Sequence, residues 1–254
     1  MEKHLNFKDR TGERVKNYQG YWMTIVKYRN GNDITIEFDD KRKTIRENVL
    51  YSNFSKGIVK NLFHPEVLGV GWIGEGDYKA KVNGKMTPEY NYWFRMMRRC
   101  YQEGYKDFMY YKDVIVCEEW HNFQNFAKWF TEIYNKDTME KWDLDKDILN
   151  PLSKEYSPLN CCIIPHEINS IFRTSKSGKN NNLRGAMFRR GRYEVYISVR
   201  NKRKYVGSSK IEEKAHEIYK KAKKEHIKEM ANEYRGQITK EVYEAIINFD
   251  ISLL

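Results

Sequence analysis

The chain lacks any long hydrophobic run, and this absence excludes a class of protein. No stretch of about 18 or more apolar residues occurs among its 254 residues, so we expect no transmembrane helix. The first residues, Met1 to Asn6, are polar and do not form the apolar block of a signal peptide. We therefore expect a cytoplasmic protein, in the cytosol of the cell that makes it, with no membrane partner.

Cysteine is scarce as well. The four cysteines are Cys100, Cys117, Cys161 and Cys162, and none of them forms the C-x-x-C pair that is typical of zinc sites. In a cytoplasmic protein such residues are expected to be free and mostly buried thiols. Cys100, Cys117 and Cys161 could still converge in space on a metal ion, so zinc binding stays open.

Aspartate is missing from residues 171–240, and the charge of the chain is lopsided as a result. This stretch contains 20 Lys or Arg against 7 Glu, a net charge of +13, which leaves −2 for the rest of a chain whose total is +11. A solvated surface usually mixes the two signs. The segregated basic excess therefore predicts a module in the last third that binds a polyanion.

The first third of the sequence has a β pattern. Hydrophobic residues favour strands over 21–28 and 33–38, and the second of these alternates with Ile34, Ile36 and Phe38 on one face. Asn30-Gly31 between them is typical of a hairpin turn. We expect residues 1–78 to form a small β-barrel-like module, either a binding surface or a scaffold.

The middle third is aromatic and helical in pattern. Two segments, 90–101 and 119–130, each carry a stripe of apolar residues at helical spacing, which predicts a core rather than a cofactor site. The stripes are Trp93, Met96, Met97 and Cys100, and then Trp120, Phe123, Phe126, Ala127 and Phe130. A strand is expected over 141–148.

The last third predicts three strands followed by a long helix. The strands are expected over 183–188, 192–200 and 202–206, and the helix over 211–234, where Ser209 and Glu212 have capping-box spacing. The whole chain is thus expected to have an α+β fold with domains at 1–78, 79–172 and 173–254.

Three motifs between residues 144 and 169 resemble the core of the HNH nucleases. They are Leu144-Asp145-Lys146-Asp147-Ile148, Tyr156-Ser157-Pro158-Leu159-Asn160-Cys161 and His166-Glu167-Ile168-Asn169. The wider frame, with Trp93 to Met96, Arg99-Cys100-Tyr101 and Val116 to Phe123, is similar to the phage-borne HNH family that often carries an AP2-type DNA-binding domain.

This resemblance implies a ββα-metal unit in residues 79–172. In such a unit Asp145 and Asn169 would hold Mg²⁺ or Mn²⁺, and Asn160 would position the loop or the base. The implied activity is metal-dependent cutting or nicking of double-stranded DNA.

Lys146 departs from the family pattern, because it stands where the general-base histidine should be. An ammonium group is protonated at neutral pH and cannot act as a base, although it could contact phosphate. His166 and Glu167 are the substitute bases nearby in sequence. Strand alternation would place Asp143, Asp145 and Asp147 together, either as an acidic Mg²⁺ site or as a solvated face.

The last third resembles the AP2 domain. The matching residues are Gly191 to Ile197, Lys204 to Gly207, and Glu212 to Ala215 with Ala222. The resemblance implies that the sheet enters the major groove, and the alternation within each strand assigns the outward residues. RNA stays open as a ligand. The expected DNA contacts are Arg184, Arg189, Arg190, Arg192, Tyr196, Arg200, Arg203 and Tyr205.

Two functions are compatible with these features. One is a DNA-binding HNH-type endonuclease of a phage or mobile element, with Lys146, Asn160 and His166 as its catalytic residues. The other is a catalytically inactive relative without a metal, which regulates or blocks by binding DNA or a host protein. The AP2-like third serves both functions equally.

Overall fold

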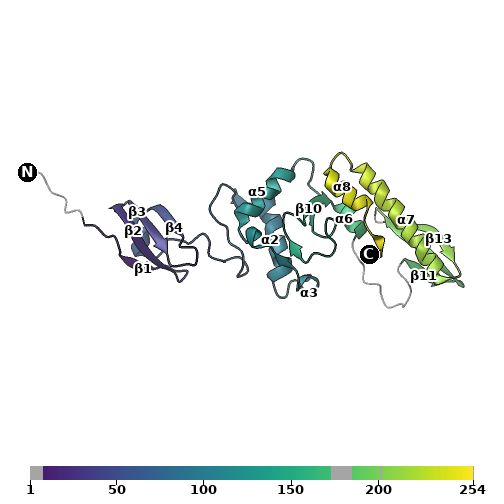
Figure 1. Cartoon of the computed structure of the whole chain (residues 1–254), viewed down its shortest axis with the longest axis horizontal. Coiled ribbons are helices and arrows are strands. Elements are labelled where there is room, and N and C mark those ends of the chain that lie inside the picture. Colours follow the sequence, from purple (N-terminus) through teal and green to yellow (C-terminus); the bar gives the residue numbers. More distant parts are fainter. Residues whose placement is uncertain (1–7, 173–184, 201, 254) are drawn as a thin grey trace, which may run out of the picture.

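The computed structural model describes residues 8–172, 185–200 and 202–253. Over these residues the chain is a mixed α+β protein with several small sheets. Figure 1 shows three parts that follow one another along the longest axis, with the N-terminal sheet at one end and the last sheet and its long helix at the other. None of the helices in the described part is both long and apolar enough to cross a membrane.

The N-terminal part is an open antiparallel sheet. Its strands are β1 (Arg14–Lys16), β2 (Trp22–Asn30), β3 (Asp33–Phe38) and β4 (Ile45–Val49), paired in chain order and followed by α1 (Tyr51–Ser55). The two expected strands are confirmed, and the turn between them is Gly31-Asn32, one residue later than expected, because Asn30 pairs with Asp33. β1 and β4 do not pair, however, so the described strands do not close into a barrel. The inward side chains of β2 and β3 form a small core with Phe54 of α1.

The central part is built on helices. Its first elements, in chain order, are β5 (Lys81–Val82), β6 (Lys85–Met86), α2 (Pro88–Tyr101), α3 (Phe108–Tyr111), β7 (Ile115–Val116), α4 (Glu118–His121) and α5 (Phe123–Ile133). The segment expected as one helix is two, because the Asn122 side chain accepts a hydrogen bond from the Gln124 amide and begins α5.

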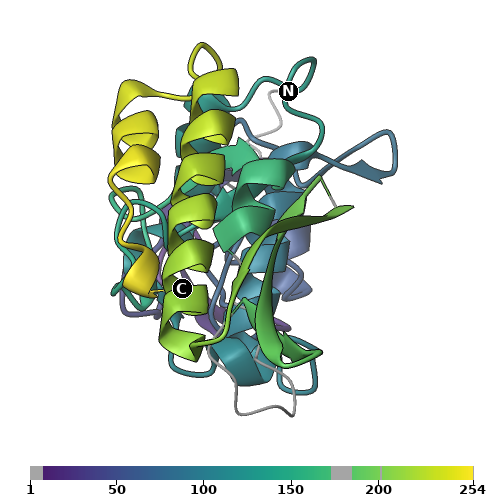
Figure 2. The same ribbon diagram turned by 90° about the vertical axis from the view of Figure 1, so that its right-hand side faces the viewer.

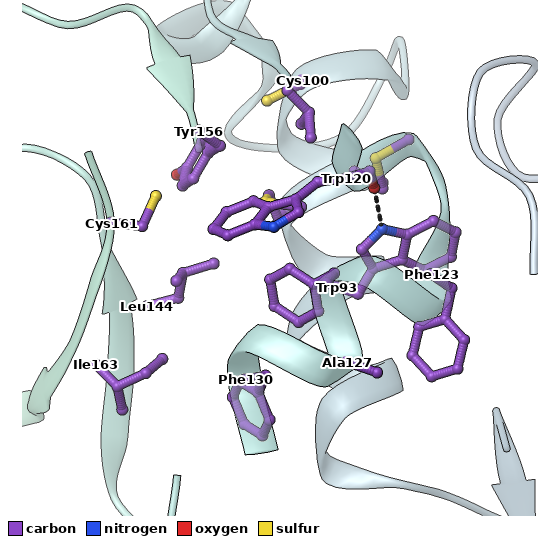
Figure 3. Close-up of a cluster of buried hydrophobic side chains, with 14 of the residues drawn as sticks. Trp93, Cys100, Trp120, Phe123, Ala127, Phe130, Leu144, Tyr156, Cys161 and Ile163 are labelled. Carbon is purple, nitrogen blue, oxygen red and sulfur yellow. Dashed lines mark hydrogen bonds between the residues drawn. The ribbon is translucent and has the colours of Figure 1, made fainter. Parts of the chain in front are cut away.

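Both apolar stripes of these helices are buried, as predicted. Figure 3 shows their rings at the centre of the core, with Leu144, Cys161 and Ile163 extending toward them from the strand side. The Trp93 indole donates a hydrogen bond of 2.7 Å to the Trp120 carbonyl, which ties α2 to α4 inside the core.

A two-stranded antiparallel sheet and a helix follow. β8 (Trp142–Asp145) pairs with β10 (Cys162–Pro165), and α6 (His166–Phe172) begins directly after β10. The intervening loop contains β9 (Glu155–Tyr156), which pairs with β7. Two paired strands and a helix thus form a ββα arrangement, called the ββα unit below. The expected strand over 141–148 ends early, at Asp145, where the chain turns.

The C-terminal part is a three-stranded sheet covered on one face by a long helix, as predicted. The strands are β11 (Ala186–Arg189), β12 (Arg192–Val199) and β13 (Lys202–Ser209), and the helices are α7 (Glu212–Glu233), α8 (Lys240–Ile247) and the short η1 (Ile251–Leu253). Figure 2 shows α8 lying beside α7. The capping box is wrong: Ile211 is the N-cap of α7, no side chain caps it, and the Ser209 hydroxyl accepts from the Ile211 amide.

The central and C-terminal parts share a hydrophobic core. The second half of α7, together with α8, packs against β10, α6 and Ile148. The buried members of this cluster are Ile148, Cys162, Ile164, Ile168, Ile171, Ile227, Met230, Ala231, Val242 and Ile246. The boundary expected near residue 173 therefore runs between two parts that are packed together.

Candidate functional site

Asp145, the expected metal ligand, is buried at the end of β8 and is engaged by the backbone. Its Oδ1 atom accepts hydrogen bonds from the amides of Asp147 (2.8 Å) and Ile148 (2.9 Å). Burial raises the pKa of Asp145 to about 6, and the nearby carboxylate of Asp147 adds to this rise. The carboxylate thus forms the turn that ends the strand.

Lys146 is only 7% exposed, which is unusual for a lysine. Its Nζ atom donates to Asp147 Oδ1 at 2.6 Å and to the Ser153 carbonyl at 3.0 Å. The ammonium group therefore holds the loop after β8 in place, and its two described acceptors belong to that loop.

Asn160, the expected central asparagine, braces the same loop from its other end. Its amide donates to Ser153 Oγ (2.9 Å) and to the Glu155 carbonyl (3.2 Å), while its Oδ1 accepts from Asn150 (3.3 Å). These contacts connect Asn150, Ser153 and Glu155 within the loop. They do not bring Asn160 to a reacting group.

Asn169 and His166 meet at Asp143 rather than at Asp145. Asn169 Nδ2 lies 2.9 Å from Asp143 Oδ2, and His166 Nδ1 lies 2.6 Å from the same oxygen. Asp143 comes from β8 and the other two residues from α6, so the pairing of β8 with β10 brings them together. Sequence reasoning singled out all three residues but not this combination.

The expected metal set is not assembled. Asp143, Asp145 and Asp147 have different partners: α6, the backbone and Lys146. In the residues that the structure describes, no group of three or more His, Cys, Asp or Glu side chains could hold a metal ion. Burial raises the pKa of Cys100 to about 12 and that of Cys161 further still, so both are thiols at neutral pH while no metal is bound. The implied ligands Asp145 and Asn169 have different partners: Asp145 accepts from the Asp147 and Ile148 amides, and Asn169 donates to Asp143.

A cavity of about 1160 Å³ opens beside Asp143 and His166. Its lining includes Tyr92 and Arg95 of α2 and Lys141 just before β8. The His166 side chain is 52% exposed, and when its Nδ1–H donates to Asp143 the Nε2 atom keeps a lone pair for another partner. Sequence reasoning missed Arg95 and Lys141 as site residues, because only the fold brings them to the cavity that His166 also lines.

A second site is the outer face of the C-terminal sheet. Tyr196 and Tyr205 are cross-strand partners there, with ring centroids 5.4 Å apart. The guanidinium of Arg203 lies 4.0 Å from the centre of the Tyr196 ring, and the Tyr196 hydroxyl donates to Glu194. The inward residues of the same strands pack on α7 instead. The strand alternation that was expected is therefore present.

Two arginines lie directly opposite each other at one end of this face. Arg189 and Arg192 are paired in register, with Arg190 and Gly191 forming the turn between them. Like charges placed opposite each other disfavour a strand pair. No carboxylate lies within 4.0 Å of Arg189, Arg192 or Arg203 in the described part of the chain, so these charges are available to an anionic ligand.

The remaining arginines of the expected set differ. Arg200 turns away from the face: it forms ion pairs with Glu233 of α7 at 2.5 Å and with Glu167 of α6 at 3.9 Å. It therefore joins the sheet to the central part. Arg184 lies outside the described residues.

No family model, curated protein or solved structure matches the chain. The HNH and AP2 resemblances therefore stay predictions, carried by the residues quoted for them. The chain has no family membership established by comparison, and its function has to follow from its two sites.

Proposed function

We propose that this chain binds double-stranded DNA through the outer face of β11–β13. The observation that carries the proposal is the group of Arg189, Arg192 and Arg203 beside two tyrosines, with no ion pair in the described residues to neutralise them. Guanidinium groups form forked hydrogen bonds with phosphate and guanine, and tyrosine packs on sugars. The opposed Arg189 and Arg192 are costly without an anion and favourable with one.

We infer that the ββα unit does not cleave DNA with the expected residues. Lys146 is held by Asp147 and Ser153, and Asp145 Oδ1 is held by two amides, so neither is arranged to activate water. This supports the second of the two functions expected from the sequence, a DNA-binding protein that is a catalytically inactive relative of the nucleases.

One observation favours cleavage as a second candidate. His166 is oriented by Asp143 beside a cavity that also has Arg95 and Lys141 in its wall. His166 Nε2 could take the proton of a water that attacks a phosphodiester, and the two cations could attract the phosphate. In this candidate His166 replaces Lys146 as the functional base.

Duplex binding is tested by fluorescence anisotropy with a labelled duplex over a range of salt concentrations. We expect the Arg189→Ala/Arg192→Ala/Arg203→Ala variant to lose at least about tenfold in affinity and to reduce the salt slope by about 3. The matched control, Lys214→Ala/Lys221→Ala/Lys224→Ala, removes three exposed charges from α7 and should change both quantities less. Equal losses in the two variants would refute the assignment of the face.

Cleavage is tested with supercoiled plasmid in Mg²⁺ or Mn²⁺. We expect the natural chain to leave the plasmid intact, because Lys146 cannot act as a base. Activity that appears only in Lys146→His would support the inactive-relative proposal. Nicking by the natural chain that is lost in His166→Ala but kept in Lys146→Ala would establish the second candidate instead, with matching thermal unfolding as the check on folding.

A further inference from the structure

The N-terminal sheet has an outer face that the functions above do not use. Met23 and Ile25 of β2 are buried under the sheet, so their neighbours Trp22 and Thr24 lie on the opposite face. Residues paired across neighbouring strands lie on the same face of a sheet, so the pairings of β2 with β1 and β3, and of β3 with β4, show which other residues belong to this outer face. Its members are Arg14, Lys16, Trp22, Thr24, Lys27, Thr35, Glu37 and Ile45.

This outer face is positively charged. Arg14, Lys16 and Lys27 are exposed and have no carboxylate within 4.0 Å among the residues that the structure describes. Glu37 is its acidic member, and Lys43 lies 3.6 Å from it. The nearby Asp39 accepts a hydrogen bond from the Trp22 amide at 2.9 Å, which occupies one of its oxygens at the edge of the sheet. Arg14, Lys16 and Lys27 are therefore three cations of this face without an ion pair among the described residues.

Trp22 is an indole exposed on this charged face. It is 42% exposed, whereas Trp72, Trp93, Trp120 and Trp142 are buried and Trp129 is half-buried. The guanidinium of Arg14 lies 5.1 Å from the centre of its ring. A large aromatic side chain on a solvent-facing strand contributes little to the core below and offers its ring to a ligand from solvent.

We propose that the outer face of β1–β4 binds single-stranded nucleic acid. A base would stack on the Trp22 ring, while Arg14, Lys16 and Lys27 contact the phosphates on either side. Aromatic platforms within a basic surface bind unpaired strands in this way with little sequence preference, since every base has a π-face. Three unneutralised cations favour a polyanion over an apolar peptide, and the paired bases of a duplex have no free face for the indole.

This surface is separate from the DNA-binding face of β11–β13, which belongs to a different sheet at the other end of the molecule (Figure 1). The two proposals therefore stand or fall separately. The test uses the full chain with Arg189→Ala/Arg192→Ala/Arg203→Ala as background, so that the C-terminal sheet contributes little. The probe is a labelled oligodeoxythymidine of about 12 nucleotides.

Removing the indole should weaken binding of this probe by about tenfold or more. In the triple-arginine background we expect that loss for Trp22→Ala. Trp22→Phe should bind the probe about as tightly as the triple-arginine variant itself. Arg14→Ala/Lys16→Ala should reduce the dependence of affinity on salt concentration. Leu50→Ala is the matched control, because Leu50 is also 42% exposed but lies outside the sheet. In the natural background Trp22→Ala should leave duplex affinity unchanged.

Fluorescence gives an independent readout from the same residue. The emission that disappears in Trp22→Phe belongs to the exposed indole, and we expect added oligodeoxythymidine to quench that component. Equal affinity of Trp22→Ala and the background for the probe, or an exposed-indole emission that saturating probe does not change, would overturn the proposal. Duplex binding by the natural chain would survive either result.

Discussion

At the residue scale, Asp145 illustrates how one side chain can match a catalytic motif and have a structural role. Its carboxylate accepts from two amides and ends β8, while Lys146 ties the following loop to Asp147 and Ser153. The motif drew attention to both residues. It could not show their hydrogen bonds, because these depend on the path of the loop through residues 146–161.

The pKa of Asp145 leads to a prediction about stability and pH. Burial raises this pKa from 3.8 to about 6, so the folded chain prefers the protonated form. The contribution of Asp145 to the free energy of unfolding is fully present below about pH 4 and is lost as the pH rises through about 6. Asparagine mimics the neutral form and keeps an acceptor oxygen for the two amides. The free energy of unfolding of Asp145→Asn, relative to that of the natural chain, should therefore increase by up to about 3 kcal/mol between pH 4 and pH 8.

Urea unfolding at intervals across this pH range measures the difference. Asp143→Asn is a suitable control because Asp143 has different partners, His166 and Asn169. A constant difference between Asp145→Asn and the natural chain from pH 4 to pH 8 would contradict the raised pKa.

The contact between Asp143 and His166 could not have been predicted from the sequence. The two residues are 23 positions apart and meet because β8 and β10 pair with Trp142 opposite Pro165. The HNH resemblance suggested Asn169 as the partner of Asp145. A one-residue change in that register would have turned Asp143 to the other face, so the pairing itself decides the site.

At the element scale, the features predicted well are those with a local cause. The apolar stripes of α2, α4 and α5 are buried, and β3 spans Asp33–Phe38 as expected, because a period of 3.6 or 2 residues is visible within one segment. α7 likewise matches its expected range to within a residue at each end. Of these elements, α2 lines the cavity beside His166 and α7 supports the C-terminal sheet.

The features that were missed depend on single side chains or on distant partners. The apolar stripe continues past Asn122, but the Asn122 side chain caps α5 and so divides the expected helix in two. The alternation of residues continues past Asp145, but the Asp145 carboxylate accepts from the Ile148 amide and so ends the strand. Closure of the N-terminal sheet would require β1 to meet β4, which no local pattern specifies. Strand alternation predicts Arg200 on the outer face, but its side chain forms ion pairs with Glu167 of α6 and Glu233 of α7.

At the scale of the whole molecule, the shared core joins the central part to the C-terminal part. α7 covers its own sheet with its first half and packs on β10 and α6 with its second half. The Arg200–Glu167 ion pair and the Tyr234–Glu167 hydrogen bond lie beside this junction. The outer face of β11–β13, where we propose DNA binding, and the ββα unit should therefore keep a fixed position relative to each other.

This packing predicts that residues 79–253 unfold as one cooperative unit. Ile227 of α7 is buried among side chains of the central part, so Ile227→Ala should cost about 2–5 kcal/mol and should destabilise both parts together. Hydrogen exchange measures this at the amides of Ile163 and Ile164 in β10 and at those of Val195 and Ile197 in β12. The exposed neighbour Lys228→Ala is the control. If Ile227→Ala speeds exchange in β12 and leaves β10 unchanged, the two parts unfold independently and the shared core does not couple them.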